Sequence, residues 1–115
     1  MRHDPDCIFC KIAKGDIPSK LIHQDEDLIV FHDIRPHAPV HFLIVPREHI
    51  PRLQDCEPRH EALLGKMVAL APKLASDLGL ANGFRVVVNN GQDGGQEVYH
   101  LHVHVMGGPR PWKIG

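Results

Sequence analysis

The sequence predicts an α+β domain, with a five-stranded antiparallel sheet and one short and one long helix. Three observations lead to this class. Short runs of β-branched and aromatic residues recur along the chain, separated by turn residues. One segment, residues 57–78, repeats apolar residues at helical spacing. The strands mostly follow one another directly, which favours antiparallel pairing over a parallel sheet.

The first half of the chain supplies the short helix and three strands. The helix is expected at residues 7–14, where apolar residues share one side before Gly15 and the prolines beyond it break the chain. The acidic segment 25–27 is a plausible hairpin turn, and Pro46 is expected to stop the third strand. The three expected strands are 21–24, 28–32 and 41–45.

The second half begins with the long helix, which Pro58 opens because proline is tolerated in a first turn. Gly79 is a good C-terminal stop, and Pro72 removes one backbone hydrogen bond inside the helix. The apolar stripe is wider than a small monomer needs, so part of it is expected to face a partner subunit. The fourth strand is expected at 84–89, followed by a glycine-rich loop at 90–96.

The fifth strand carries the most informative pattern, because His100, His102 and His104 alternate with apolar residues. Strict alternation predicts a half-buried strand whose three imidazoles share one face. The outer two histidines would be about 13 Å apart along a straight strand. A single metal ion held by all three therefore fits poorly, and separate roles fit better: one nucleophile, one neighbour that tunes it, and one histidine placed elsewhere.

Composition limits the function classes. The chain has 115 residues, which suits one domain spanning 1–115, and its 43% hydrophobic and 23% charged residues are ordinary for a globular protein. A net charge of −1 predicts no nucleic-acid partner. The apolar runs are too short for a membrane span and the N-terminus lacks a signal-peptide core, so we expect a cytoplasmic protein without a membrane partner.

Three further motifs suggest chemistry. The glycine-rich loop could bring backbone N–H groups close to an anion, or could be a mobile hairpin loop. Cys7 and Cys10 have metal-ligand spacing, although a metal-free or redox-active thiol pair explains the spacing equally well. Asp33, at a strand end, could accept both ribose hydroxyls, with apolar neighbours enclosing a base; the alternative is a turn aspartate beside core residues.

The histidine pattern, preceded by Asp-Gly-Gly-Gln-Glu-Val-Tyr at 93–99, resembles the histidine triad nucleotide-binding family. The match is close to its Hint branch, the purine nucleoside phosphoramidases, and extends from about Cys7 to Trp112. Supporting segments include Phe-His-Asp-Ile at 31–34 and Ala-Pro-Val-His-Phe at 38–42. The resemblance implies a five-stranded antiparallel sheet that continues across a homodimer.

The same resemblance implies roles for single residues. His102 matches the nucleophile, and His104 and His41 match the histidines that complete the active-site network. The residues that match the nucleoside pocket are Ile8, Phe9, Ile12, Phe31, His32, Asp33 and Ile34. Those that match the phosphate surroundings are Asn89, Gly95 and Val98. Glu97 stands near the leaving group, where animal members often carry serine and bacterial-type relatives carry glutamate.

Metal binding is implied as well. In members with the cysteine pair, four residues resemble the ligands of a structural zinc: Cys7, Cys10, His49 and His100. This Cys₂His₂ set suits zinc chemically, and no metal is needed for the catalysis. The C-terminal tail is short, and in relatives this tail helps to set substrate preference, a role that Trp112 could have here.

The resemblance implies a hydrolase of purine nucleoside 5′-phosphoramidates, such as adenosine 5′-phosphoramidate or adenylylated lysine. A nucleotidyl-histidine would form and water would release the nucleoside monophosphate. One alternative is a Fhit-like hydrolase of dinucleoside polyphosphates, although the run at 94–99 favours the Hint branch. A nucleotidyltransferase is disfavoured, because transferases usually carry glutamine where His104 stands. A non-catalytic nucleotide- or protein-binding scaffold is the remaining alternative.

Overall fold

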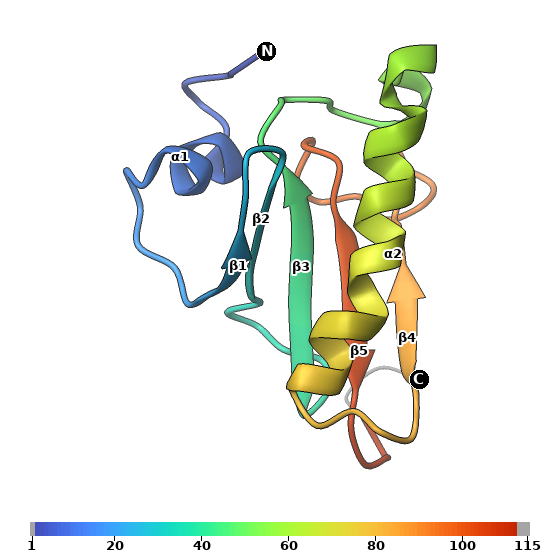
Figure 1. The fold of residues 1–115 in the computed structure, drawn as a ribbon. Helices are drawn as coiled ribbons and strands as arrows, with labels where there is room; N and C mark the ends of the chain where they lie inside the picture. Colours follow the sequence, from blue (N-terminus) through green and yellow to red (C-terminus); the bar gives the residue numbers. More distant parts are fainter. Residues whose placement is uncertain (1, 113–115) are drawn as a thin grey trace.

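The computed structural model describes residues 2–112 and contains one five-stranded antiparallel sheet (Figure 1). Its spatial order is β1-β2-β3-β5-β4, so neighbouring strands are sequential except where β5 lies between β3 and β4. The strands are β1 (Leu21–Gln24), β2 (Leu28–His32), β3 (Val40–Pro46), β4 (Phe84–Val87) and β5 (Val103–Gly107). The predicted fold class is confirmed.

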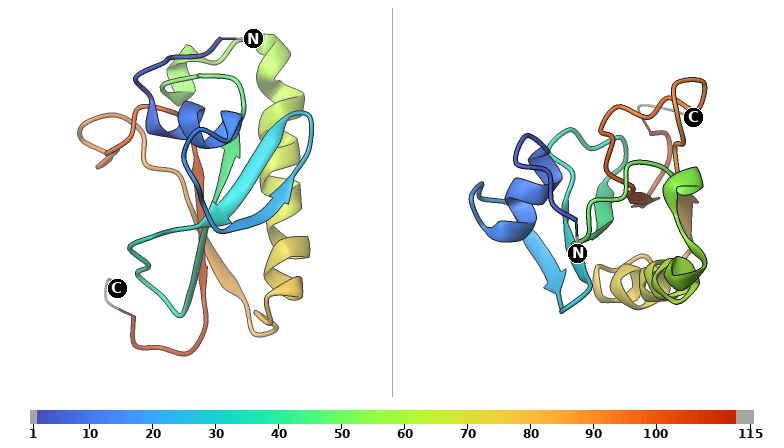
Figure 2. Two further views of the ribbon diagram at one scale, coloured as in Figure 1. Left: turned by 90° about the vertical axis from the view of Figure 1, so that its left-hand side faces the viewer. Right: turned by 90° about the horizontal axis from the view of Figure 1, so that it is seen from above.

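The two helices lie on opposite faces of the sheet (Figure 2). The long helix α2 (Glu61–Asp77) covers one face along its length, whereas the short helix α1 (Ile8–Lys14) covers only part of the other. Each helix encloses an apolar cluster. The larger lies under α2 and includes Leu28, Val30, Phe42, Ile44, Met67, Leu74, Val103 and Val105. The smaller lies under α1 and includes Phe9, Ile12, Ile29, Phe31, Leu43 and Val45.

The period of two along the strands decides which face each histidine occupies. In β5, Val105 pairs with Phe42 and contributes to the cluster under α2. His104 pairs with Leu43, which belongs to the cluster under α1. Within β5 the alternation therefore places Val103 and Val105 under the long helix and His104 on the opposite face, where α1 leaves part of the sheet uncovered. His100 and His102 precede the strand.

Several element boundaries differ from the sequence-based expectation. β5 begins only at Val103, because the Leu101 N–H donates to the Ile50 carbonyl at 2.7 Å and lies outside the β3–β5 ladder. β4 ends at Val87, two residues earlier than expected. β3 includes Pro46 as its last residue. Proline has no backbone N–H, and at the end of a strand this does not interrupt the pairing of later residues.

The start of the long helix also differs. Pro58 opens a 3₁₀ turn at Pro58–His60, and α-helical geometry begins at Glu61. A second 3₁₀ turn, Leu53–Asp55, precedes it. Among the residues that the structure describes, no helix combines the length and apolar character needed to cross a bilayer.

Asp25 organises the turn between β1 and β2 and connects it to α2. Its Oδ1 accepts the backbone N–H groups of Asp27 and Leu28 at 2.8 and 2.9 Å and the Lys66 ammonium at 3.1 Å. Its Oδ2 lies 2.8 Å from His23 Nε2. Burial alone would raise the pKa of this carboxyl, but the hydrogen bonds from His23, the two amides and Lys66 lower it well below its usual range.

We therefore expect Asp25→Ala to reduce the free energy of unfolding by about 1–3 kcal/mol, because two backbone donors lose their acceptor. Chemical denaturation measures the loss, and Glu26→Gln, at an exposed neighbour, serves as control. A carboxyl with a lowered pKa stabilises the fold above the pKa of the unfolded chain, about 3.9, and this stabilisation disappears as the pH falls further. The two proteins should therefore converge in acid; a constant difference would contradict the role of the charge.

Candidate functional site

His102 is held in a single orientation on the face that α1 only partly covers. Its Nδ1 lies 2.7 Å from the backbone carbonyl of His100, so this nitrogen donates and carries the proton. The other ring nitrogen, Nε2, then keeps its lone pair. The Phe9 ring meets the imidazole edge-on, with centroids 5.0 Å apart, and the His104 ring lies at 4.8 Å. A fixed neutral imidazole with a free Nε2 has the form required of a nucleophile.

His41 and His104 form a hydrogen-bonded pair with a defined direction. The backbone N–H of His37 donates to His41 Nδ1 at 3.0 Å, so neutral His41 carries its proton on Nε2. His41 Nε2 lies 3.0 Å from His104 Nδ1, which therefore accepts. The proton of neutral His104 is consequently on Nε2. The Asp33 carboxylate lies 3.5 Å from His41 Nε2 and favours the same arrangement.

Burial keeps these imidazoles neutral near pH 7. Desolvation, together with the neighbouring imidazoles of His102 and His41, lowers the pKa of His104 to about 4. Desolvation also lowers the pKa of His102, opposed by its hydrogen bond to the His100 carbonyl and by the carboxylates of Asp33 and Glu97. The pKa of His41 is lowered for the same first reason. The site therefore presents lone pairs and N–H donors rather than imidazolium charges.

A cleft of about 700 Å³ opens beside this network. Of the residues expected in the site, four line it: His32, Asp33, Ile34 and His41. Ile34 is 90% exposed, so its side chain offers apolar surface to a ligand. Asp33 Oδ1 accepts the Arg35 N–H at 2.8 Å, which holds the carboxylate at the edge of the cleft. The remaining lining residues are Pro18, Ser19, Lys20, Pro36 and Pro39.

The other apolar residues expected to enclose a base are placed differently. Phe9, Ile12 and Phe31 are buried in the cluster under α1, and Val98 packs against that cluster. The rings of Phe9 and Phe31 meet edge-on at 5.6 Å. Ile8 is 45% exposed on α1. These side chains therefore support the histidines from below more than they present open surface to a ligand.

The glycine-rich loop is anchored rather than loose. Gln96 is buried: its Nε2 donates to the carbonyls of Pro51 and Val98 at 2.7 and 3.0 Å, and its Oε1 accepts the Gly91 N–H. Gly95 has a φ of +77°, which favours glycine. A Cβ on Gly94 would meet the backbone of Asn90. Asn89 is half-buried just before this loop, and Glu97 is exposed just after it.

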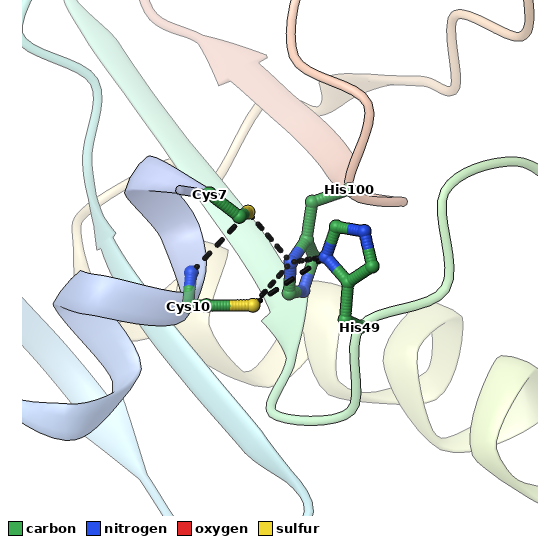
Figure 3. A group of neighbouring side chains, drawn as sticks. All are labelled: Cys7, Cys10, His49 and His100. Atoms are coloured by element: carbon green, nitrogen blue, oxygen red, sulfur yellow. Dashed lines mark hydrogen bonds between the residues drawn. The ribbon is translucent and has the colours of Figure 1, made fainter. Parts of the chain in front are cut away.

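A second group of side chains lies beyond the histidine network, where α1 approaches the start of the fifth strand. Figure 3 shows Cys7, Cys10, His49 and His100 pointing toward one another. His100 Nδ1 lies 3.3 and 3.5 Å from the two sulfurs and 3.2 Å from His49 Nδ1, while Cys10 Sγ lies 3.4 Å from His49 Nδ1. All four ligand atoms are within 4.8 Å of one another.

These separations fit a tetrahedral metal. Zinc bonds of about 2.0 Å to nitrogen and 2.3 Å to sulfur place neighbouring ligand atoms about 3.3–3.8 Å apart. His100 Nε2 donates to the Pro46 carbonyl at 2.7 Å, which leaves Nδ1 free to ligate. Backbone N–H groups of Asp4 and Cys10 point at the sulfurs of Cys10 and Cys7, each at 3.4 Å. The structure thus brings together the four residues expected from the sequence, and backbone hydrogen-bond donors and acceptors contact their side chains.

Asp33, His41 and His104 also lie close enough to hold an ion. The hydrogen bonds argue against this interpretation. Because His41 Nδ1 accepts the His37 N–H, its Nε2 carries a proton and cannot ligate in the same state. This group is better described as a proton-bearing network than as a metal site.

Sequence reasoning missed several contributors. The N–H of His37 and the carbonyl of Pro46 are backbone groups, and a pattern of side chains does not indicate which backbone groups will form hydrogen bonds. Ser19 and Lys20 line the cleft, although nothing in their spacing indicated it. Trp112 donates from Nε1 to the Gly108 carbonyl at 3.0 Å, with the Arg110 guanidinium 4.0 Å from the centre of its ring. The end of the tail, 113–115, lies outside the described residues.

With this geometry established, comparisons with known proteins are informative. The family model "HIT domain" matches residues 14–110. The chain is 46% identical over 104 residues to Protein HitA of Neisseria gonorrhoeae, covering 90% of this chain and 97% of that protein. It is 44% identical over 104 residues to the purine nucleoside phosphoramidase of Escherichia coli, covering 90% and 87% respectively.

Solved structures agree. A histidine triad protein from Clostridium difficile superposes with a TM-score of 0.91 at 40% identity, covering 96% of each chain. A HIT family hydrolase from Legionella pneumophila gives 0.88 at 44% identity, covering 91% and 95%. A Zn-bound histidine triad family protein from Mycobacterium smegmatis gives 0.80 at 33% identity, covering 89% of this chain and 74% of that one.

Proposed function

This chain belongs to the HIT domain family, and we propose that it hydrolyses the P–N bond of purine nucleoside 5′-phosphoramidates. One observation carries the proposal: His102 Nδ1 is hydrogen-bonded to the His100 carbonyl, so Nε2 is an unprotonated, oriented nucleophile. The 44% identity to a purine nucleoside phosphoramidase supports this substrate class.

In the proposed reaction, His102 Nε2 attacks the α-phosphorus and the P–N bond breaks; the departing nitrogen takes up a proton from solvent and leaves as an amine. Water then attacks the phosphorus of the nucleotidyl-histidine, the P–Nε2 bond breaks, and one proton of the water returns to solvent, which releases the nucleoside monophosphate and the free imidazole. The Nε2–H of His104 is the outward donor of the His41–His104 pair and hydrogen-bonds a phosphoryl oxygen. Backbone N–H groups around Gly95 and Val98, together with Asn89, stabilise the developing charge. Glu97 lies on the leaving-group side.

The nucleoside occupies the cleft. The Asp33 carboxylate accepts the ribose hydroxyls, since an ionised carboxylate offers several lone pairs to paired donors. His32 and the exposed Ile34 contact the base, while Phe9, Ile12 and Phe31 support this surface from the cluster below and Ile8 contributes from α1. The main alternative, hydrolysis of dinucleoside polyphosphates, uses the same nucleophile and differs in the group that leaves. A non-catalytic scaffold would bind nucleotide without turnover.

We propose further that Cys7, Cys10, His49 and His100 hold a structural zinc ion. Four of the separations between their ligand atoms, 3.2–3.5 Å, are close to tetrahedral spacing, and the soft sulfur-nitrogen set selects zinc. A Zn-bound structure among the similar proteins supports the identity of the metal. Four protein ligands leave no open coordination position, so these residues contribute to folding and take no part in bond making.

We also propose a homodimer in which β4 pairs with its counterpart. β4 is an edge strand, and its Val86 is 41% exposed. On α2, which lies beside β4 in Figure 1, Val68 is 54% exposed. An edge strand with an apolar surface is a template for pairing, and two-fold symmetric pairs are the commonest oligomers.

His102→Ala should reduce the turnover of adenosine 5′-phosphoramidate by about 10⁴-fold or more, because the covalent route is lost. Binding of adenosine monophosphate, measured by calorimetry, should persist. His3→Ala, at an exposed position, controls for the loss of an imidazole. Retention of more than a few per cent of wild-type turnover would remove His102 as nucleophile. Faster turnover of a dinucleoside polyphosphate by the wild-type protein would favour the alternative enzyme, and no turnover of either substrate would favour the scaffold.

Elemental analysis of untagged protein should find about one zinc per chain, as expected for one closed four-ligand site. Cys7→Ser combined with Cys10→Ser should abolish it and lower the free energy of unfolding, because metal-binding free energy appears as folding free energy. Cys56→Ser is the matched control, since this thiol is not among the four ligands. Zinc near zero under reducing, metal-replete conditions would refute the site; full occupancy in the double variant would place the metal elsewhere.

Light scattering should give a particle of about 26 kDa, twice the chain mass of 12.9 kDa, as expected for a symmetric pair. Val86→Lys should shift the protein toward the monomer, because it places a charge on the exposed edge strand. Lys73→Glu, on an exposed position of α2, serves as a control for a change of surface charge. A wild-type monomer at micromolar concentration would contradict the dimer.

A further inference from the structure

The metal-ligand group and the proposed nucleophile share one residue. The His100 side chain belongs to the Cys/His group through Nδ1, while its backbone carbonyl accepts the Nδ1 proton of His102 at 2.7 Å. The same ring is tied to the sheet, because Nε2 donates to the Pro46 carbonyl. The carbonyl that selects the His102 tautomer is therefore held by the contacts of the His100 side chain together with the hydrogen bond from the adjoining Leu101 N–H to the Ile50 carbonyl.

A second connection runs through α1. Phe9 lies between Cys7, the N-cap of α1, and Cys10 in its first turn. The Phe9 ring meets the His102 ring edge-on, with centroids 5.0 Å apart and planes at 86°, and it contacts the His100 ring at 5.8 Å. The segment that carries both thiols therefore also supplies the side chain that supports the imidazole of His102.

Together these contacts hold His102 from two sides: the His100 carbonyl holds Nδ1, and Phe9 supports the ring. Both sides are anchored by members of the Cys/His group. The four ligand side chains contact one another through weak sulfur and imidazole interactions of 3.2–3.5 Å and through the edge-on contact of the His49 and His100 rings at 5.1 Å. Ligands that converge on one ion are held at bonding distance, so α1 and His100 would move as one unit.

We propose that the Cys/His group is a positioning device for the nucleophile: its four residues, joined by a metal ion, clamp His102 in the tautomer with a free Nε2. This inference rests on the proposed function, since it concerns the residue proposed to attack phosphorus. It extends the group's role from folding to preparing the reactive nitrogen, with His100 and Phe9 as positioning residues.

The test reads the tautomer of His102 directly. Two-bond ¹H–¹⁵N spectra of ¹⁵N-histidine-labelled protein distinguish the Nδ1–H and Nε2–H forms, and His102→Gln assigns the signal. With Zn²⁺ bound, we expect the Nδ1–H form alone. After chelation, the ratio of the two forms should fall by about tenfold, the size of one net hydrogen bond. An unchanged ratio, in stripped protein whose sheet amide signals persist, would overturn the clamp.

Phe9→Leu keeps the inference testable if stripping unfolds the chain. In the Zn²⁺-loaded variant, the Nε2–H form of His102 should become detectable, because the ring loses its edge contact. Ile29→Val trims the same apolar cluster from β2 and should leave the tautomer unchanged. Identical spectra for the two variants would count against the clamp. The spectra are independent of turnover, so a fully active His102→Ala protein would refute the nucleophile without deciding the clamp.

Discussion

The hydrogen bond from His102 Nδ1 to the backbone carbonyl two residues earlier is the interaction on which the proposed chemistry depends. An imidazole in water exchanges its proton between two nitrogens, and only one form leaves Nε2 free to attack. A main-chain acceptor selects that form without adding a charge to the site. The selection requires His100 to lie outside the regular β ladder, and β5 does begin only at Val103.

Neutrality is the second requirement, and burial supplies it. The rings of His41, His102 and His104, with neighbouring centroids 4.8–5.2 Å apart, would repel one another if charged, but desolvation lowers the pKa of each. Neutral imidazoles can then share protons in one direction, beginning at a backbone N–H and ending at the outer nitrogen of His104. The same burial that assembles the core therefore also prepares the site.

The division of the sheet into two unequal faces explains where the cleft lies. The long helix covers one face and encloses the larger apolar cluster. The short helix covers only part of the other face, and the loop through Pro36 and Pro39 bounds the remainder. His41 of β3 therefore lines the cleft, and His104 of β5 lies behind it in hydrogen-bond contact with His41.

The sequence by itself determined the fold class, the approximate position of β5 and the face that His104 occupies. These follow from short-range periodicity: a period of two sorts β5, and a period of 3.6 defines α2. The family resemblance, resting on ordered local motifs, indicated the four Cys/His residues that the fold brings together. Asp33 was found because a carboxylate at a strand end is visible as a side chain.

Only the tertiary structure decided the tautomers, the true start of β5 and the walls of the cleft. The acceptor for His102, the donor to His41 and the acceptor for His100 are backbone groups, which every residue has and no pattern distinguishes. Phe9, Ile12 and Phe31 have the same apolar character whether they contact a base or fill a core, and packing beneath α1 settled their burial. Contacts between distant parts of the chain placed Pro46 beside His100 and Lys20 beside the cleft. Local sequence patterns do not predict such contacts.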